Sequence, residues 1–156
     1  MPTPGFVLTL REKIGHDPLW LPGVTAVVFD DGGKVLLGQR ADTGDWTLIT
    51  GMLDPGEEPA VGAAREVLEE TGVVARMEGL VAVHSQAPIT FPNGDQCQFM
   101  NLVFKAQSVS GVARVNDDES VDVGWFGLDE LPPLRAAHQQ WLQWALDFAG
   151  ETRFLR

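Results

Sequence analysis

The sequence predicts an α+β domain, an α/β/α sandwich with a mixed β-sheet between two helices. Three observations predict this class. Short apolar runs typical of strands lie on both sides of one amphipathic helical segment, residues 59–71. A second amphipathic segment, residues 135–149 (RAAHQQWLQWALDFA), follows the last apolar run. Strands and helices do not alternate regularly, which argues against a repeating parallel β-α unit.

The strands are predicted from apolar runs bounded by turn residues. Residues 24–29 (VTAVVF) indicate a buried strand, and Asp30-Asp31-Gly32-Gly33 indicates a hairpin turn into a returning strand, 35–39. Further strands are expected at 6–14 (an edge strand), 46–49, 73–84, 97–106 and 121–126, with a turn at PNGD (92–95).

The chain length favours one domain. The chain has 156 residues, which is enough to bury a core without disulfides or structural metal. We expect a single domain over residues 1–156, with an N-terminal extension (1–21), a core (22–134) and a C-terminal helix (135–156).

Composition restricts the partners. The formal net charge is −11, from 22 acidic and 11 basic residues, and such a surface repels nucleic acid polymers and anionic membranes. No apolar run is long enough for a transmembrane helix, and no signal peptide is recognisable at the N-terminus, so we expect a cytoplasmic protein. The single cysteine, Cys97, excludes an internal disulfide and indicates a small buried apolar residue.

Segment 59–71 contains an unusual set of carboxylates. Pro59 suits the first helical turn and Gly72 the residue after the last. Glu66, Glu69 and Glu70 share one face because their spacing is i, i+3, i+4, while an alanine-rich stripe that includes Leu68 lies on another face. A solvated acidic face is the simple interpretation. However, the helix dipole disfavours acids near the C-terminal end, and a bound Mg²⁺ or Mn²⁺ would remove the conflict.

The preceding loop, Gly51-Met52-Leu53-Asp54-Pro55-Gly56-Glu57, complements this helix. Its glycines permit tight turns, which allow a backbone carbonyl to approach a metal ion. Glu57 is placed to form an ion pair with Arg65 that fixes the loop on the helix.

Together these residues resemble the signature of a known family. Segment 51–73, GMLDPGEEPAVGAAREVLEETGV, meets every fixed position of G-x5-E-x7-R-E-U-x-E-E-x-G-U, the Nudix box, where U is aliphatic. The resemblance to Nudix (MutT-like) hydrolases extends over about residues 22–134.

The resemblance implies a mixed-sheet Nudix fold and an enzyme. It implies Mg²⁺- or Mn²⁺-dependent hydrolysis of a pyrophosphate bond in a nucleoside diphosphate linked to another group, with ADP-ribose-like and (d)NTP substrates as the two subclasses. The implied metal ligands are Gly51 (through its carbonyl), Glu57, Glu66, Glu69 and Glu70. The resemblance also places Arg65 in the catalytic site, where it is expected to orient Glu57.

The general base and the substrate contacts remain open at this level. Glu119 is the candidate base, and the alternative is a glutamate of the box, Glu69 or Glu66. Asp117 and Asp118 are weaker candidates in the same loop as Glu119. Arg40 is expected to meet a phosphate, and Phe91 to line a base or sugar pocket. Trp141 and Trp144 indicate core packing or a homodimer.

Two other functions compete with hydrolysis. One is a catalytically silent Nudix domain that binds a nucleotide for regulation, against which the complete box argues. The other is a Nudix-fold isomerase of isoprenoid diphosphates.

Overall fold

The computed structural model describes residues 3–156, which form one mixed sheet with helices on both faces. The central strand β1 (Leu19–Phe29) pairs in parallel with β7 (Gln96–Ser110), and every other strand pair is antiparallel. The sheet order is β3-β2-β1-β7-β5, with β4 paired to β1, β6 to β7 and β8 to β2. The remaining strands are β2 (Val35–Arg40), β3 (Trp46–Thr47), β4 (Ile49–Met52), β5 (Val74–Ser85), β6 (Ile89–Thr90) and β8 (Ser120–Phe126).

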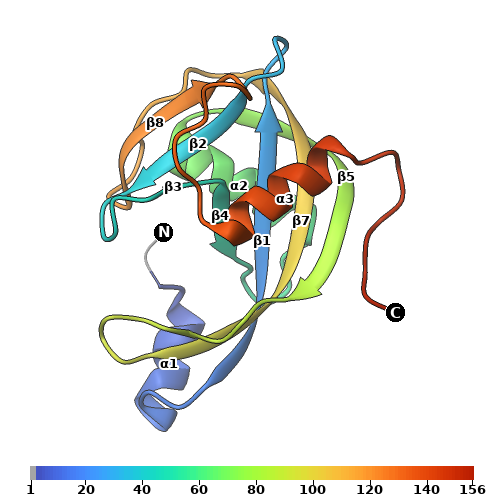
Figure 1. Ribbon diagram of the computed structural model, residues 1–156. Helices are drawn as coiled ribbons and strands as arrows, with labels where there is room; N and C mark the ends of the chain where they lie inside the picture. Colours follow the sequence, from blue (N-terminus) through green and yellow to red (C-terminus); the bar gives the residue numbers. More distant parts are fainter. Residues whose placement is uncertain (1–2) are drawn as a thin grey trace.

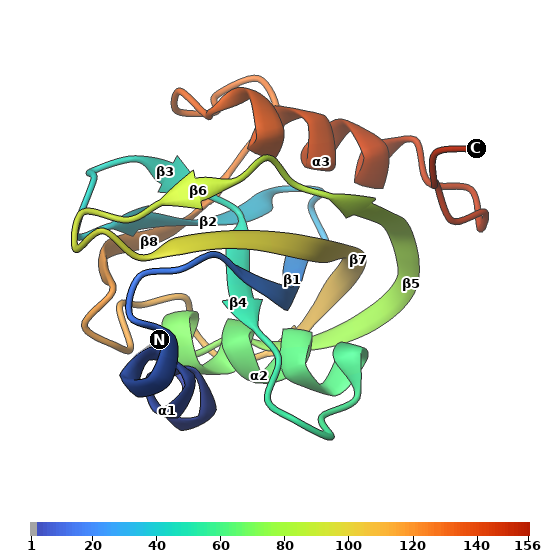
Figure 2. The ribbon, with the colours of Figure 1, turned by 90° about the horizontal axis from the view of Figure 1, so that it is seen from below.

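The predicted α/β/α layering is confirmed. Figure 2 shows the sheet between α3 (Ala136–Leu146) and α2 (Pro59–Thr71). Strand β1 separates the two cores, because its successive side chains point to opposite faces. Ala26 and Val28 pack in the cluster that contains Val67 of α2, while Val27 lies in the cluster that contains Trp141 of α3.

Helix α2 has the predicted bounds. Pro59 occupies its first turn, and Gly72 ends it in the left-handed conformation at φ 71°. The face it buries differs from the expected one: Glu66 and Glu70 lie on the buried side with Ala63 and Val67, whereas Leu68 is 46% exposed. The helix therefore turns two carboxylates toward the protein interior.

The predicted edge strand at 6–14 is wrong, because this segment forms helix α1 (Gly5–Ile14). Alternating apolar residues in the sequence suggested a strand, yet Leu8 and Leu10 are exposed. A different residue, Val7, anchors the helix against Leu21 and Cys97. Figure 1 shows α1 beside the lower end of β1, apart from the two helices that cover the sheet.

Other elements differ from the prediction mainly at their ends. The hairpin turn after Phe29 is present, and the strand expected at 46–49 is two short strands separated by Leu48. The C-terminal helix ends at Leu146, and the tail after it returns to β5, where the backbone of Arg153 bonds to Val81 and Val83. Among the described residues, no helix is long and apolar enough to cross a membrane.

Candidate active site

Arg65 is the centre of the first group of acidic side chains. Its Nε and Nη2 donate to the two carboxylate oxygens of Glu57 at 2.7 and 2.9 Å, which is the ion pair expected from the sequence. Arg65 Nη2 also donates to the carbonyl of Met52, and Glu57 accepts from the backbone N–H of Asp54. Arg65 holds the pKa of Glu57 below its usual value. The arginine therefore ties the loop to α2 and keeps Glu57 ionised.

Two further carboxylates of α2 bind the same guanidinium. Glu66 Oε1 accepts from Arg65 Nη1 at 2.9 Å and Glu69 Oε2 at 3.1 Å. Their environments differ, because Glu66 is 1% exposed whereas the Glu69 side chain is 49% exposed. Burial raises the pKa of Glu66 to about 7.

Glu66 carries an unsatisfied buried atom. Its Oε2 is buried and has no hydrogen-bond partner among the described residues. Gly51 of β4 lies against this carboxylate so closely that a Cβ at Gly51 would be 2.2 Å from Glu66 Cδ. Only glycine leaves room for the buried carboxylate, which gives the box glycine a role at this site beyond flexibility.

The second group of carboxylates joins α2 to a distant loop. One carboxylate oxygen from each of Glu70, Asp117 and Glu119 lies within 4.8 Å of the others. Burial raises the pKa of Glu70 to about 8, and the charges of Glu66 and Asp117 act in the same direction. Like charges gathered out of water favour either protonation or a bound cation.

Asn116 brings this loop to the helix. Its Nδ2 donates to the carbonyls of Leu68 and Glu69, and its N–H bonds to the carbonyl of Glu70. These are carbonyls of the last turn of α2, where an ordinary helix leaves carbonyls without intrahelical partners; the carbonyl of Leu68 also accepts from the N–H of Gly72. Asn116 was not among the residues predicted from the sequence. The available signal was an amide residue immediately before an acidic run, which is too common to identify a helix cap.

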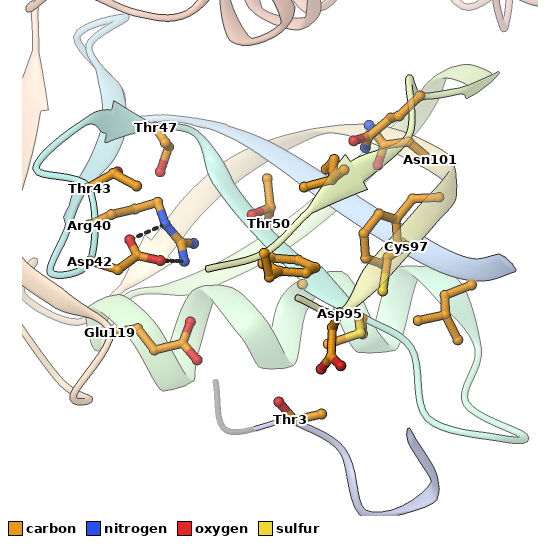
Figure 3. A pocket seen from close by; sticks show the side chains of 18 of the residues that line it. Thr3, Arg40, Asp42, Thr43, Thr47, Thr50, Asp95, Cys97, Asn101 and Glu119 are labelled. Atoms are coloured by element: carbon orange, nitrogen blue, oxygen red, sulfur yellow. Dashed lines mark hydrogen bonds and ion pairs between the residues drawn. The ribbon is translucent and has the colours of Figure 1, made fainter. Parts of the chain in front are cut away.

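A cavity of about 640 Å³ opens beside these carboxylates. Gly51 and Glu119 lie at its wall, and so do both predicted substrate residues, Arg40 and Phe91. Figure 3 shows Arg40 joined to Asp42, and the two hydrogen bonds are 2.8 and 2.7 Å long. Asp42 thus already neutralises Arg40, a pairing that was not predicted from the sequence.

The residues present fit a divalent cation. Mg²⁺ and Mn²⁺ prefer carboxylate oxygens, and the site offers a buried carboxylate oxygen without a partner together with the cluster of Glu70, Asp117 and Glu119. Of the predicted ligands, Glu66 and Glu70 are buried, whereas both oxygens of Glu57 bind Arg65. Asp117 was not among the metal ligands predicted from the sequence, but in the fold its carboxylate lies close to that of Glu70.

Comparisons with known proteins agree with this site. The NUDIX domain model matches residues 19–145. A MutT-like protein of Streptomyces ambofaciens is 35% identical over 140 residues, covering 89% of this chain and 85% of that protein. The NAD-capped RNA hydrolase NudC of Vibrio cholerae is 34% identical over 103 residues, but this chain spans only 35% of its length.

Solved structures of hydrolases are also similar to this chain. An ADP-ribose pyrophosphatase of Streptococcus suis superposes with a TM-score of 0.67 at 27% identity, covering 86% of this chain and 98% of that one. A MutT Nudix hydrolase of Burkholderia pseudomallei gives 0.66 at 32% identity, with 80% and 97% coverage.

The mixed sheet and the carboxylate-bearing helix beside a cavity define a hydrolase domain built around the 51–73 box. The chain belongs to the Nudix family, which confirms the resemblance seen in that box. It is a pyrophosphohydrolase of that family.

Proposed function

We propose that the chain hydrolyses a pyrophosphate bond in a nucleoside diphosphate linked to another group, in a reaction that requires Mg²⁺ or Mn²⁺. One observation carries this proposal. Buried carboxylates of α2, one with an oxygen that lacks a partner, lie with Asp117 and Glu119 beside a cavity of about 640 Å³. Enzymes of the Nudix family generally use divalent metal ions.

The residues of the site have two roles, metal binding and positioning. Glu66 and Glu70 would hold the cation, with Glu69, Glu57 and the Gly51 carbonyl as the further predicted ligands. Arg65 is a positioning residue, since it holds three glutamates and the loop carbonyl of Met52. When bound, the cation supplies charge neutralisation of the phosphate oxygens and lowers the pKa of an attacking water.

We assign the general base to Glu119 rather than to Glu69. Glu119 lies at the cavity wall beside Glu70 and Asp117, whereas Glu69 is half exposed and bonded to Arg65. The base accepts a proton as the water oxygen bonds to phosphorus, and the bridging P–O bond breaks to release a phosphate leaving group.

ADP-ribose-like compounds and (d)NTPs are the substrates we propose to test first. Among similar proteins, one is described as an ADP-ribose pyrophosphatase and one as a putative 8-oxo-dGTP diphosphatase. A cytoplasmic location, a homodimer and the exclusion of nucleic acid polymers stay predictions.

The test is a panel of nucleotide derivatives incubated with Mg²⁺, Mn²⁺ or EDTA, with products identified by ³¹P NMR and chromatography. Reaction in ¹⁸O-labelled water identifies the phosphorus that is attacked. We expect metal-dependent cleavage of at least one substrate. Binding of a nucleotide without cleavage would instead favour the silent regulatory domain.

Paired variants test the base. Glu119→Gln is expected to lower turnover at least about a hundredfold, since general base catalysis contributes roughly 10²–10⁴-fold. Asp118→Asn is the matched control, because Asp118 is exposed in the same loop. Full activity of Glu119→Gln would return the role to a glutamate of the box.

A further inference from the structure

The cavity has a second wall, away from the carboxylates, at the start of α3. Leu134, just before α3, forms a bridge with Trp46 of β3, and Arg135 forms an ion pair with Asp45. Gln139 Nε2 donates to the carbonyl of Leu134 at 2.8 Å. These contacts fix the first turn of α3 over the β3 and β4 strands. His138 lies in this turn and lines the cavity.

The fold determines which nitrogen of His138 carries the proton. Leu48 separates β3 from β4, and its backbone N–H donates to His138 Nδ1 at 3.2 Å. A nitrogen that accepts this bond is unprotonated, so the proton of a neutral imidazole is on Nε2. The ring of Trp141 packs edge-on against the imidazole, with centroids 4.8 Å apart, and holds its plane.

His138 is neutral at physiological pH. Burial lowers its pKa to about 4, and the charges of Arg135 and Arg40 act in the same direction. Asp45 opposes them with a smaller effect. The imidazole is therefore a hydrogen-bond donor without charge.

The Nε2–H group is available to a ligand. No hydrogen bond from it to another residue of the described range 3–156 is present, and it is not among the buried atoms that lack a partner. The atom therefore keeps some accessible surface, and His138 lines the cavity. The neighbouring cations are already neutralised, Arg40 by Asp42 and Arg135 by Asp45.

A wall of this kind suits an uncharged partner. Phosphate oxygens are bound best by charged donors such as arginine, and here the arginines have carboxylate partners. A neutral donor held by the backbone and by an aromatic ring suits a carbonyl, a ring nitrogen or a sugar oxygen.

We propose that His138 is a substrate-binding residue whose Nε2–H donates a hydrogen bond to an uncharged oxygen or nitrogen of the base or sugar of the substrate. This assignment rests on the proposed function, because it takes the ligand to be a nucleoside diphosphate derivative. It places the nucleoside at the α3 wall and the pyrophosphate at the carboxylates of α2.

Two substitutions separate binding from structure. In His138→Asn, the side-chain oxygen can replace Nδ1 as the acceptor for Leu48, but no donor reaches the position of Nε2. In His138→Gln, the amide nitrogen can reach the position of Nε2, while the bond to Leu48 is lost. A purely structural histidine would be replaced better by asparagine, and a ligand donor better by glutamine.

The binding test uses the non-hydrolysable α,β-methylene analogues of ADP-ribose, ATP and dGTP, with methylenediphosphonate as a probe that lacks a nucleoside. We measure their dissociation constants with Mg²⁺ by calorimetry. For the analogue that binds best, His138→Asn should raise Kd roughly 5- to 30-fold, the range expected when one partner of a buried hydrogen bond is removed. His138→Gln should remain within about threefold of wild type, and Kd for methylenediphosphonate should not change in either variant.

A second readout needs no ligand. Long-range ¹H–¹⁵N NMR spectra should show His138 with Nδ1 unprotonated and Nε2 protonated from pH 5.5 to 8, and the Nε2 signal should shift when the analogue binds. Equal affinity of His138→Asn and wild type, or an imidazole that titrates above pH 6, would overturn the assignment of His138 alone. If no analogue binds and the substrate panel is not cleaved, the proposed function fails as well.

Discussion

Glu66→Gln should stabilise the metal-free protein at high pH while it disables the enzyme. Glu66 is 1% exposed, and burial raises its pKa from 4.5 to about 7. The folded state therefore favours the neutral carboxyl. Its stabilising contribution is complete below pH 4.5 and is lost as the pH rises from 4.5 through about 7.

The magnitude follows from that pKa difference. One pKa unit corresponds to about 1.4 kcal/mol, so ionised Glu66 costs about 3 kcal/mol of folding free energy at pH 8.5. Glutamine removes this cost but leaves an amide group without a partner at the position of Oε2. That unpaired amide lowers the free energy of unfolding by about 1 kcal/mol. The net gain of about 2 kcal/mol should raise Tm by about 4–8 °C in a chain of this size.

The assay is thermal unfolding followed by circular dichroism in EDTA, at pH 5.0 and pH 8.5. We expect the Tm of Glu66→Gln to exceed that of wild type at pH 8.5 and to match it at pH 5.0. Glu69→Gln is the matched control, because it removes one charge from the exposed side of the same helix. An equal change in Tm of Glu66→Gln at both pH values, or the same effect in Glu69→Gln, would show that the burial of ionised Glu66 does not destabilise the fold.

Three further predictions concern the same site. Gly51→Ala should lower Tm by several degrees and reduce turnover, since overpacking costs roughly 1–3 kcal/mol; Gly5→Ala, with open space around the new methyl group, is the control, and equal Tm values would contradict the steric argument. Asn116→Ala should cost about 1–2 kcal/mol in urea unfolding and reduce turnover, because two bonds to the end of α2 are lost; wild-type turnover would show that the carboxylate loop is held by other contacts. Mg²⁺ at a hundred times its Kd should stabilise the folded protein by about 3 kcal/mol and should raise Tm more at pH 8.5 than at pH 5.0; a rise in Tm that is independent of pH would argue against carboxylate ligands.

Local signals in the sequence predicted helix α2 well. Its limits are set by Pro59 and Gly72, whose conformational preferences act within a few residues. The ion pair between Glu57 and Arg65 was predictable for the same reason, because both lie in one short loop–helix unit.

Features that depend on tertiary packing were not predictable. Helical periodicity places three glutamates on one face, but it does not say that the sheet covers Glu66 and leaves Glu69 exposed. The contact of the Asn116 loop with α2 joins segments far apart in the chain, and no local preference encodes it. The prediction for segment 6–14 was wrong because it rested on a local pattern alone: alternating apolar residues suggested a strand, but the segment is a helix whose buried residue Val7 packs with Leu21 and Cys97.

The parallel pairing of β1 with β7 has a consequence for how the chain folds. Leu19 pairs with Cys97 and Phe29 with Gln107, so the central strand gains this neighbour only after the box helix and β5 have been synthesised. Contacts between such distant residues require a large loop to close first, which slows folding. During synthesis on the ribosome, α2 therefore emerges before β7 and before the loop that follows it, so the cluster of Glu70, Asp117 and Glu119 forms only after β7 has been synthesised.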